Sequence, residues 1–319
     1  MLIDLAIVGA GSMGSNHARV GLGLRDARIS AIVDPDPERG GKLATTVGAA
    51  YYPDVTDLPA TVDAAVVAVP TDLHVPVSTE LLAMGKHLLV EKPIARTVED
   101  ARFLVGAARD AGKILMVGHV ERFNPAVVEL AAIVAEPIHI DAQRVSAFVG
   151  RIREGVVLDL MTHDLDIVTA LVNRPVVEVQ ASVSTLRSGM EDLGVALLRF
   201  EGGTSATVTA SRIGQDKIRR ISVTETEAYY VADLLRQDLT IHRQTHPDYT
   251  AETRGYRQQS LIEIPYITTR GEPLHNELEH FVRCVIDGSE PLVSGESATA
   301  TIELVQQVLT AAGTDAIAS

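Results

Sequence analysis

The 319-residue sequence is poor in residues on which several classes of protein depend. Its one cysteine, Cys284, cannot form a disulfide within the chain, and a reducing compartment fits best. Cys284 lies in an apolar helical pattern, which favours a small buried hydrophobe over a nucleophile. There is no tryptophan, and aromatic residues make up 4%, which argues against a base-stacking surface for nucleic acid.

Positive charge is also scarce. The chain has 28 Lys and Arg against 42 Asp and Glu, a net charge of −14, and no dense basic run, so binding to nucleic acid is not expected. No apolar run is long enough to cross a bilayer. Asp4 interrupts the short apolar run at an N-terminus that lacks the basic residues of a signal peptide. We therefore expect a cytoplasmic protein with no nucleic-acid or membrane partner.

Short apolar runs alternate with helical patterns over the first 120 residues. Strands alternating with helices indicate βαβ units and a parallel sheet, whose strands are apolar throughout because both faces are buried. This rhythm predicts a first α/β domain over residues 1–120. The expected strands lie within residues 5–8, 29–33, 64–69, 88–90 and 114–117, and residues 98–111 show helical spacing.

After residue 120, apolar and polar residues alternate with a period of two. That pattern predicts a large antiparallel sheet that is covered on one face. Gly202-Gly203 between two such runs indicates a hairpin turn. The polar face is rich in Ser and Thr, and it is either solvated or meets a second subunit. Helical patterns cover residues 158–172, 274–286 and 298–311. The predicted fold class is α/β, with a second domain over residues 121–319 whose last helix is able to pack back on the first.

A glycine-rich loop follows the first apolar run. Gly9, Gly11 and Gly14 fit the G-x-G-x-x-G pattern, with Ser12 and Met13 inside it. The three glycines permit the tight turn, the approach of a pyrophosphate and close helix–strand packing, and the helix N-terminus attracts the phosphates. Asp34 ends the next apolar run about 20 residues later, where a carboxylate accepts the ribose hydroxyls of NAD and repels the 2′-phosphate of NADP. NAD is therefore the expected cofactor and NADP the less favoured one, with Arg39 close enough in sequence to keep NADP open.

Three further residues suit the oxidation of an alcohol. Lys92 follows the apolar run at residues 88–90, at an end of the sheet where ligands bind. Asp159 and His163 are four apart in a helical pattern and share one face. His163 can accept the hydroxyl proton, Lys92 can stabilise the charge on the oxygen, and Asp159 can orient the imidazole. Lys92 and His163 could exchange roles, and taken singly the residues could be a solvated lysine and an exposed helix contact. An Asp and a His supply too few ligands for a metal, so none is expected.

The ordered set of motifs resembles the Gfo/Idh/MocA family of sugar and polyol dehydrogenases. The set comprises the Gly9–Gly14 loop, Pro70-Thr71-x-x-His74, Glu91-Lys92-Pro93 and Asp159-x-x-x-His163, and it spans nearly the whole chain. The resemblance implies an N-terminal Rossmann domain and a C-terminal α/β domain with a large open, mainly antiparallel sheet. It implies that Lys92, Asp159 and His163 are catalytic, and that Pro70, Thr71, His74, Glu91 and Lys92 lie on the cofactor side. It also implies a homodimer or homotetramer formed through the open sheet.

A finer resemblance concerns the substrate. Residues 118–125, which include Arg122, and the pair Arg151 and Arg153 are similar to family members that act on nucleotide sugars such as UDP-N-acetylglucosamine. The two arginines could pair with a diphosphate, or they could be solvated in a turn. The expected substrate-binding residues are Lys92, Arg122, Arg151, Arg153, Asp159 and His163. The alternatives are a dehydrogenase of free sugars or polyols such as myo-inositol and, in another class, a non-catalytic NAD-binding redox sensor.

Overall fold

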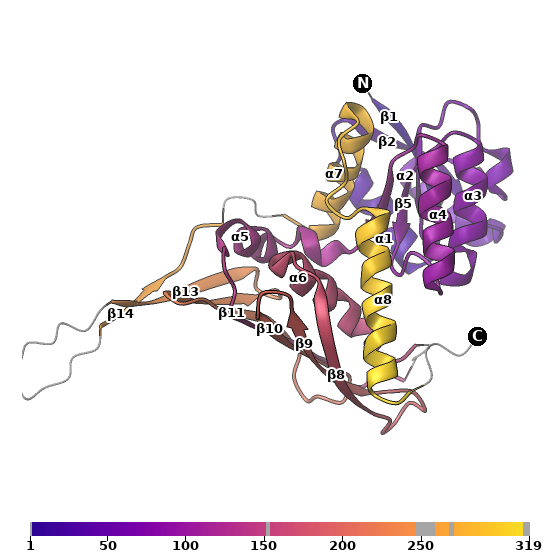
Figure 1. Ribbon diagram of the computed structural model, residues 1–319. Helices are drawn as coiled ribbons and strands as arrows, with labels where there is room; N and C mark the ends of the chain where they lie inside the picture. Colours follow the sequence, from indigo (N-terminus) through magenta and orange to yellow (C-terminus); the bar gives the residue numbers. More distant parts are fainter. Residues whose placement is uncertain (1, 151–153, 246–258, 268–270, 315–319) are drawn as a thin grey trace, which may run out of the picture. The chain divides into compact units, whose positions relative to one another are not determined.

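The computed structural model describes residues 2–150, 154–245, 259–267 and 271–314 (Figure 1). The chain divides into two compact units. The first unit comprises Met1–Phe123 and Gly271–Glu303, and the second comprises Asn124–Arg270 and Leu304–Ser319.

The first unit contains, within its described residues, a six-stranded sheet in which every neighbouring pair is parallel. This confirms the predicted parallel sheet, and the strands are apolar because helices cover both faces. The order β3-β2-β1-β4-β5-β6 reverses direction between β1 and β4, which is where such sheets bind ligands. The strands are β1 Ile3–Val8, β2 Ala27–Val33, β3 Ala50–Tyr52, β4 Ala64–Val67, β5 His87–Glu91 and β6 Leu115–Gly118.

Some helices of the first unit begin at a capping side chain or a proline. Asp36 accepts hydrogen bonds from the backbone N–H groups of Glu38 and Arg39 at the start of α2, and Thr97 caps α4 in the same way. The helices are α1 Ser12–Gly21, α2 Pro37–Val47, α3 His74–Ala83, α4 Val98–Asp110 and α7 Pro273–Asp287, with 3₁₀ turns η1 Val55–Asp57, η2 Thr71–Leu73 and η3 Val120–Phe123. Helix α8, Gly295–Ala311, begins in the first unit and ends in the second.

Helix α7 belongs to the first unit although it follows residue 270. Its buried residues Leu278 and Phe281 join the same apolar core as β1, and the helix packs against α1 and η3. Cys284 is fully buried in α7, as the apolar pattern predicts. Its residues lie near the end of α1, where a Cβ atom on Gly21 would meet Leu278, and near η3.

The second unit has an eight-stranded sheet among its described residues, in the order β14-β13-β12-β11-β7-β10-β9-β8. Neighbours are antiparallel except β7 and β10, so the expectation of a mainly antiparallel sheet is confirmed. Gly202 and Gly203 form the β9–β10 turn with φ of 87° and 95°, which a side chain would strain. The strands are β7 His139–Val145, β8 Val176–Ser184, β9 Leu193–Phe200, β10 Ser205–Ser211, β11 Ile218–Thr224, β12 Ala228–Asp233, β13 Asp238–Thr245 and β14 Gln259–Glu263.

One face of this sheet is covered by helices (Figure 1). These are α5 Pro125–Ile133, the π-helical turn η4 Val157–Met161 and α6 Thr162–Val172. In β10 the residues that alternate toward the core, Ala206, Val208 and Ala210, are fully buried, whereas Thr207 and Thr209 between them are half-buried. The other face also exposes apolar side chains, since Val195 and Leu197 of β9 are 37% and 44% exposed. None of the described helices is both long and apolar enough to span a bilayer.

Candidate functional site

The glycine loop joins β1 to α1 and has the geometry that its sequence predicts. Gly9 has φ of 98°, and a Cβ atom on Gly14 would lie 1.7 Å from the Gly9 carbonyl oxygen, so helix and strand approach too closely for a side chain. Gly11, the N-cap of α1, faces open space, because a Cβ atom there would meet nothing within 4 Å. Neither a capping side chain nor an acidic residue occupies the first turn. This end of α1, with Ser12 and Met13 in its first turn, suits the pyrophosphate of a dinucleotide.

Asp34 lies directly after β2 with its carboxylate turned toward the glycine loop. It is 2% exposed. Its Oδ2 accepts a hydrogen bond of 2.7 Å from the backbone N–H of Ala10, and its Oδ1 accepts one of 2.9 Å from that of Asp36. Arg39 of α2 donates to both oxygens, from Nη2 at 2.7 Å and from Nε at 3.1 Å. Burial opposes ionisation, but the hydrogen bonds from Arg39 and the backbone outweigh it and lower the pKa of Asp34. The Asp34 carboxylate is therefore negatively charged at neutral pH.

The loop after β4 is tied to the loop after β5 by His74. The ring is buried, with Nδ1 2.8 Å from the Pro93 carbonyl oxygen and Nε2 3.0 Å from that of Val69. Burial is the largest influence on this imidazole and lowers its pKa. Pro70 is exposed and Thr71 half-buried at the start of η2. His74 thus fixes the shape of this loop, while Pro70 and Thr71 are its accessible part.

Glu91, Lys92 and Pro93 follow β5 at the same edge of the sheet. Glu91 ends the strand, and its Oε1 lies 2.6 Å from Nε2 of His17 in α1. Its Oε2 accepts the backbone N–H of Lys92 at 3.3 Å. Lys92 is half-buried, and the Lys92–Pro93 peptide bond is cis. The glycine loop, Asp34, Pro70 and Lys92 all follow carboxyl ends of parallel strands, so the sheet collects them at one edge of the first unit.

Asp159 and His163 belong to the second unit. The structure differs here from the single α-helix that their spacing predicts. Asp159 lies in the π-helical turn η4, whereas His163 lies in the first turn of α6. A π turn is wider than an α turn, and such turns are frequent at functional sites. The turn η4 runs directly into α6, so Asp159 and His163 still lie on one continuous helical segment, whereas Lys92 belongs to the first unit.

Two arginines that the sequence analysis did not select hold this rod. Arg212, which follows β10, is 5% exposed in its side chain and donates to Oδ2 of Asp159 at 3.2 Å. It also donates to the Glu154 carbonyl oxygen at 2.7 Å. Arg144 of β7 forms a fully buried ion pair with Asp164, at 2.8 and 2.9 Å. The sequence does mark Arg144 as unusual, because a charged residue stands at a core-facing position in the alternating pattern of β7.

Of the three other arginines predicted to bind substrate, the structure describes one. Arg122 is half-buried in η3 of the first unit. Arg151 and Arg153 lie outside the described residues. Among the residues that the structure describes, no group of three or more His, Cys, Asp or Glu side chains is arranged to hold a metal ion.

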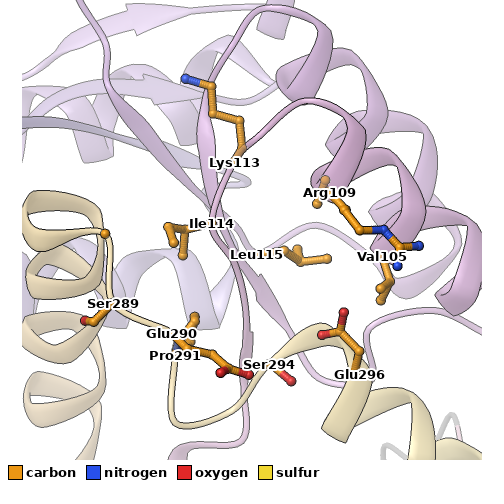
Figure 2. Close-up of a pocket in the computed structure, with 12 residues that line it drawn as sticks. Val105, Arg109, Lys113, Ile114, Leu115, Ser289, Glu290, Pro291, Ser294 and Glu296 are labelled. Atoms are coloured by element: carbon orange, nitrogen blue, oxygen red, sulfur yellow. The ribbon is translucent and has the colours of Figure 1, made fainter.

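The first unit also has a hollow of about 270 Å³ (Figure 2). Val105 and Arg109 of α4 line it together with Lys113, Ser294 and Glu296. Lys113 precedes β6, so the hollow is at the amino ends of the strands. In a parallel sheet of this kind ligands bind at the opposite edge, and none of the predicted cofactor or substrate residues lines this hollow.

Comparison with known proteins gives two matching family profiles. Residues 3–119 match an oxidoreductase family with an NAD-binding Rossmann fold, and residues 129–231 match the GFO/IDH/MocA C-terminal domain. The UDP-N-acetylglucosamine 3-dehydrogenase of Acidithiobacillus ferrooxidans is 30% identical over 238 residues, which cover 74% of this chain and 75% of that enzyme. The inositol 2-dehydrogenase of Rhizobium meliloti is 27% identical over 325 residues, or 95% of each chain.

Solved structures agree with these matches. The structure of the A. ferrooxidans enzyme has a TM-score of 0.87 at 26% identity, and the alignment covers 98% of this chain and 97% of that one. A levoglucosan dehydrogenase in complex with NADH and levoglucosan has a TM-score of 0.85 and covers 98% of both chains. Because its identity is 18%, that second likeness shows the fold alone.

Proposed function

Because this chain belongs to the Gfo/Idh/MocA family and is an NAD(P)-dependent dehydrogenase acting on CH–OH groups, we propose that it oxidises a secondary alcohol of a nucleotide sugar with NAD as the acceptor. The observation that carries the substrate class is the likeness to UDP-N-acetylglucosamine 3-dehydrogenase in both sequence and fold. An inositol-like polyol is the second candidate, because an inositol 2-dehydrogenase matches over 95% of each chain. In this proposal residues 1–120 bind the cofactor, and residues 121–319 bind substrate and form the oligomer.

The described residues of the first unit fit a dinucleotide. The open side of Gly11 and the uncapped start of α1 would hold the pyrophosphate, and the Asp34 carboxylate would accept the adenosine ribose hydroxyls. Pro70, Thr71, Glu91 and Lys92, with His74 holding their loop, would lie on the nicotinamide side. The bound nicotinamide supplies the acceptor for the hydride that leaves the alcohol carbon.

A residue of the chain must then accept the proton of the substrate hydroxyl group. We assign proton transfer to His163, because a neutral imidazole is a base suited to neutral pH. Lys92 donates a hydrogen bond that stabilises the developing negative charge on the substrate oxygen. Asp159 stabilises the charged imidazole, and Arg212 holds the Asp159 carboxylate through its hydrogen bond. Arg122, Arg151 and Arg153 are proposed to bind the nucleotide part of the substrate.

The choice of NAD over NADP is proposed from Asp34. A buried carboxylate with a lowered pKa stays charged and repels a 2′-phosphate. Arg39 neutralises part of that charge, so the preference depends on whether the guanidinium stays on Asp34 when the cofactor binds.

The open face of the second unit's sheet is the proposed surface for a homodimer or homotetramer. It presents Val195 and Leu197 between half-buried Ser and Thr side chains, and mixed faces of this kind occur in subunit interfaces. A cytoplasmic location is proposed from the lone thiol Cys284, which is buried and needs no oxidising compartment.

A substrate panel tests this function. Purified protein would be mixed with NAD and with UDP-sugars, the matching free sugars, or inositols, and NADH formation followed by absorbance. We expect kcat/KM for UDP-N-acetylglucosamine to exceed that for N-acetylglucosamine by about 100-fold, because charge-assisted contacts to a diphosphate contribute about 3 kcal/mol. A higher kcat/KM for myo-inositol would transfer the assignment to the polyol candidate. Thermal shifts measured with the same ligands report binding without turnover.

Replacing both Arg151 and Arg153 with Ala separates the nucleotide part from the sugar part. We expect KM for a UDP-sugar to rise by about 10-fold or more, while KM for a free sugar stays unchanged. Equal changes for both substrates would show that these arginines do not read the diphosphate. Arg187→Ala, in the loop before β9, is the control for losing a positive charge elsewhere in the second unit.

A further inference from the structure

Glu277 is a carboxyl group inside the first unit that the proposed mechanism does not use. It lies in α7 with an exposed fraction of 0%. Both of its carboxyl oxygens are buried, and neither has a hydrogen-bond partner among the described residues. Leaving a buried carboxyl group without a partner costs stability, so its presence calls for a reason.

The elements that bear on Glu277 are α1 and η3, against which its helix packs, and the end of β5. The titratable or charged groups on these elements are His17 and Arg19 of α1, Glu121 and Arg122 of η3, His119 just before η3, and Glu91 at the end of β5. On α7 itself they are His275, Glu279, His280, Arg283, Cys284 and Asp287. Burial first, and the negative charge of Glu91 second, raise the pKa of Glu277 well above its usual value.

Glu91 links this buried group to Lys92. One carboxylate oxygen of Glu91 lies 2.6 Å from the ring of His17, which is fully buried. The other accepts the backbone N–H of Lys92 at 3.3 Å. The carboxylate therefore stands between α1 and the backbone of the proposed electrostatic residue. A group that displaced this carboxylate would withdraw the acceptor of the Lys92 N–H.

We propose that Glu277 is a positioning residue for Lys92. Its buried, unpartnered carboxyl group on α7, which packs against α1, leaves the Glu91 carboxylate held between His17 of α1 and the Lys92 backbone. This rests on the proposed function in one respect, the action of Lys92 on the substrate oxygen. Two neighbouring carboxylates in a buried site repel one another. Loss of the Glu277 proton therefore displaces Glu91 and withdraws the acceptor of the Lys92 N–H. A displacement of about 1 Å at a reacting group is enough to lower turnover about 100-fold.

The first measurement concerns the proton and requires no substrate. Urea unfolding of the wild type, Glu277→Gln and Glu279→Gln would be followed from about pH 5 to about pH 9. Glu279 is the matched control, since it lies on the same helix with its side chain 56% exposed. The folded-state pKa of Glu277 is raised, so its stabilising contribution is complete below the unfolded pKa and is lost as the pH rises through the folded pKa. Glu277→Gln should remove this loss, and Glu279→Gln should retain it. If wild type and Glu277→Gln respond identically to pH, the proposal is overturned.

The second measurement concerns Lys92. The rate of Lys92 acetylation by acetic anhydride would be followed by mass spectrometry from about pH 7 to about pH 10 in the wild type and in Glu277→Gln. Acetylation of any lysine speeds up with pH because only the neutral amine reacts, so the comparison is the ratio of the wild-type rate to the variant rate. This ratio should change with pH as Glu277 of the wild type loses its proton. Matching profiles would overturn the positioning role. This readout needs no turnover, so it still decides the inference if no sugar is oxidised and the proposed function fails.

Steady-state kinetics supply the last comparison. Glu277→Gln keeps a neutral hydrogen-bonding group of the same shape, so its kcat at neutral pH should stay within about twofold of wild type. Glu277→Leu has no polar group to place behind Glu91, and its kcat should fall about tenfold with KM for NAD unchanged. At alkaline pH the wild-type kcat should fall while that of Glu277→Gln holds. An equal alkaline fall in both proteins would contradict the proposal, even if the leucine variant does not fold.

Discussion

Arg39 offers the sharpest test of how the first unit selects its cofactor. In the structure its guanidinium donates to both oxygens of Asp34 at 2.7 and 3.1 Å. The backbone N–H groups of Ala10 and Asp36 occupy one further position on each oxygen. A carboxylate offers about four acceptor positions, so all of them are in use. Ribose hydroxyls can therefore bind Asp34 only when Arg39 moves aside.

The cost of moving Arg39 can be bounded from its exposure. Its side chain is 51% exposed, against 2% for Asp34, so solvent screens the pair and its worth is at most about 1 kcal/mol. Arg39→Ala should thus tighten NAD binding by up to about fivefold. The displaced guanidinium is also the group within reach of a 2′-phosphate, and a charge-assisted hydrogen bond contributes about 1.5–3 kcal/mol. The same variant should weaken NADP binding by about 10-fold to 100-fold.

Isothermal titration calorimetry of NAD and NADP measures both dissociation constants without turnover. Arg28→Ala is the matched control, because Arg28 also pairs with an aspartate, Asp4, and its side chain is 64% exposed. Asp4 and Arg28 lie near the amino ends of β1 and β2, away from the glycine loop, so this control should leave both constants unchanged. If Arg39→Ala weakens NAD binding, Arg39 contacts the bound cofactor favourably and the competition argument is wrong.

Three further predictions concern the catalytic residues and acid stability. Lys92→Met should lower kcat at least about 100-fold while calorimetry still detects NAD binding; unchanged turnover would refute its role. Arg212→Met should lower kcat about tenfold through Asp159 and leave KM for NAD unchanged, with partial recovery in Arg212→Lys. Burial opposes ionisation of Asp192, but hydrogen bonds from residues 186–188 hold its pKa well below the usual value. Its stabilisation is present above an unfolded pKa of about 4 and is lost as the pH falls. Asp192→Asn should therefore unfold at a lower temperature than the wild type at neutral pH. Thermal unfolding measured in acid should show a smaller difference between the two unfolding temperatures.

Much of the fold is predictable because its signals are local. The apolar runs at β1, β2, β4, β5 and β6 identify buried parallel strands, since only a sheet covered on both faces tolerates them. Strand β3 is missing from the prediction, because three residues at a sheet edge show no period. The parallel pairing of β7 with β10 is also invisible in the sequence. Alternation reports which face of a strand is buried, and it carries no information about the neighbour.

In the candidate site, too, local features are predictable from the sequence, whereas contacts between distant residues are not. The glycine loop is a local motif, and its required glycines can be read directly from their spacing. Arg212 lies 53 positions from Asp159, and no local pattern connects the two. Glu277 looks like one more charged residue of an amphipathic helix until the packing of α7 against α1 removes it from water. The π-helical turn at Asp159 likewise has no period of its own in the sequence.

The sequence by itself determined the secondary structure of most of the chain, the turn at Gly9–Gly14 and the chemical types available for catalysis. These follow from side-chain periodicity, backbone freedom and functional groups, which act over a few neighbouring residues. Only the tertiary structure decided that α7 returns to the first unit, that Arg39 covers Asp34, and that Glu277 is buried without a hydrogen-bond partner among the described residues. Burial and electrostatic environment depend on contacts between distant segments, and the free energies that set them exist only once those segments have packed together.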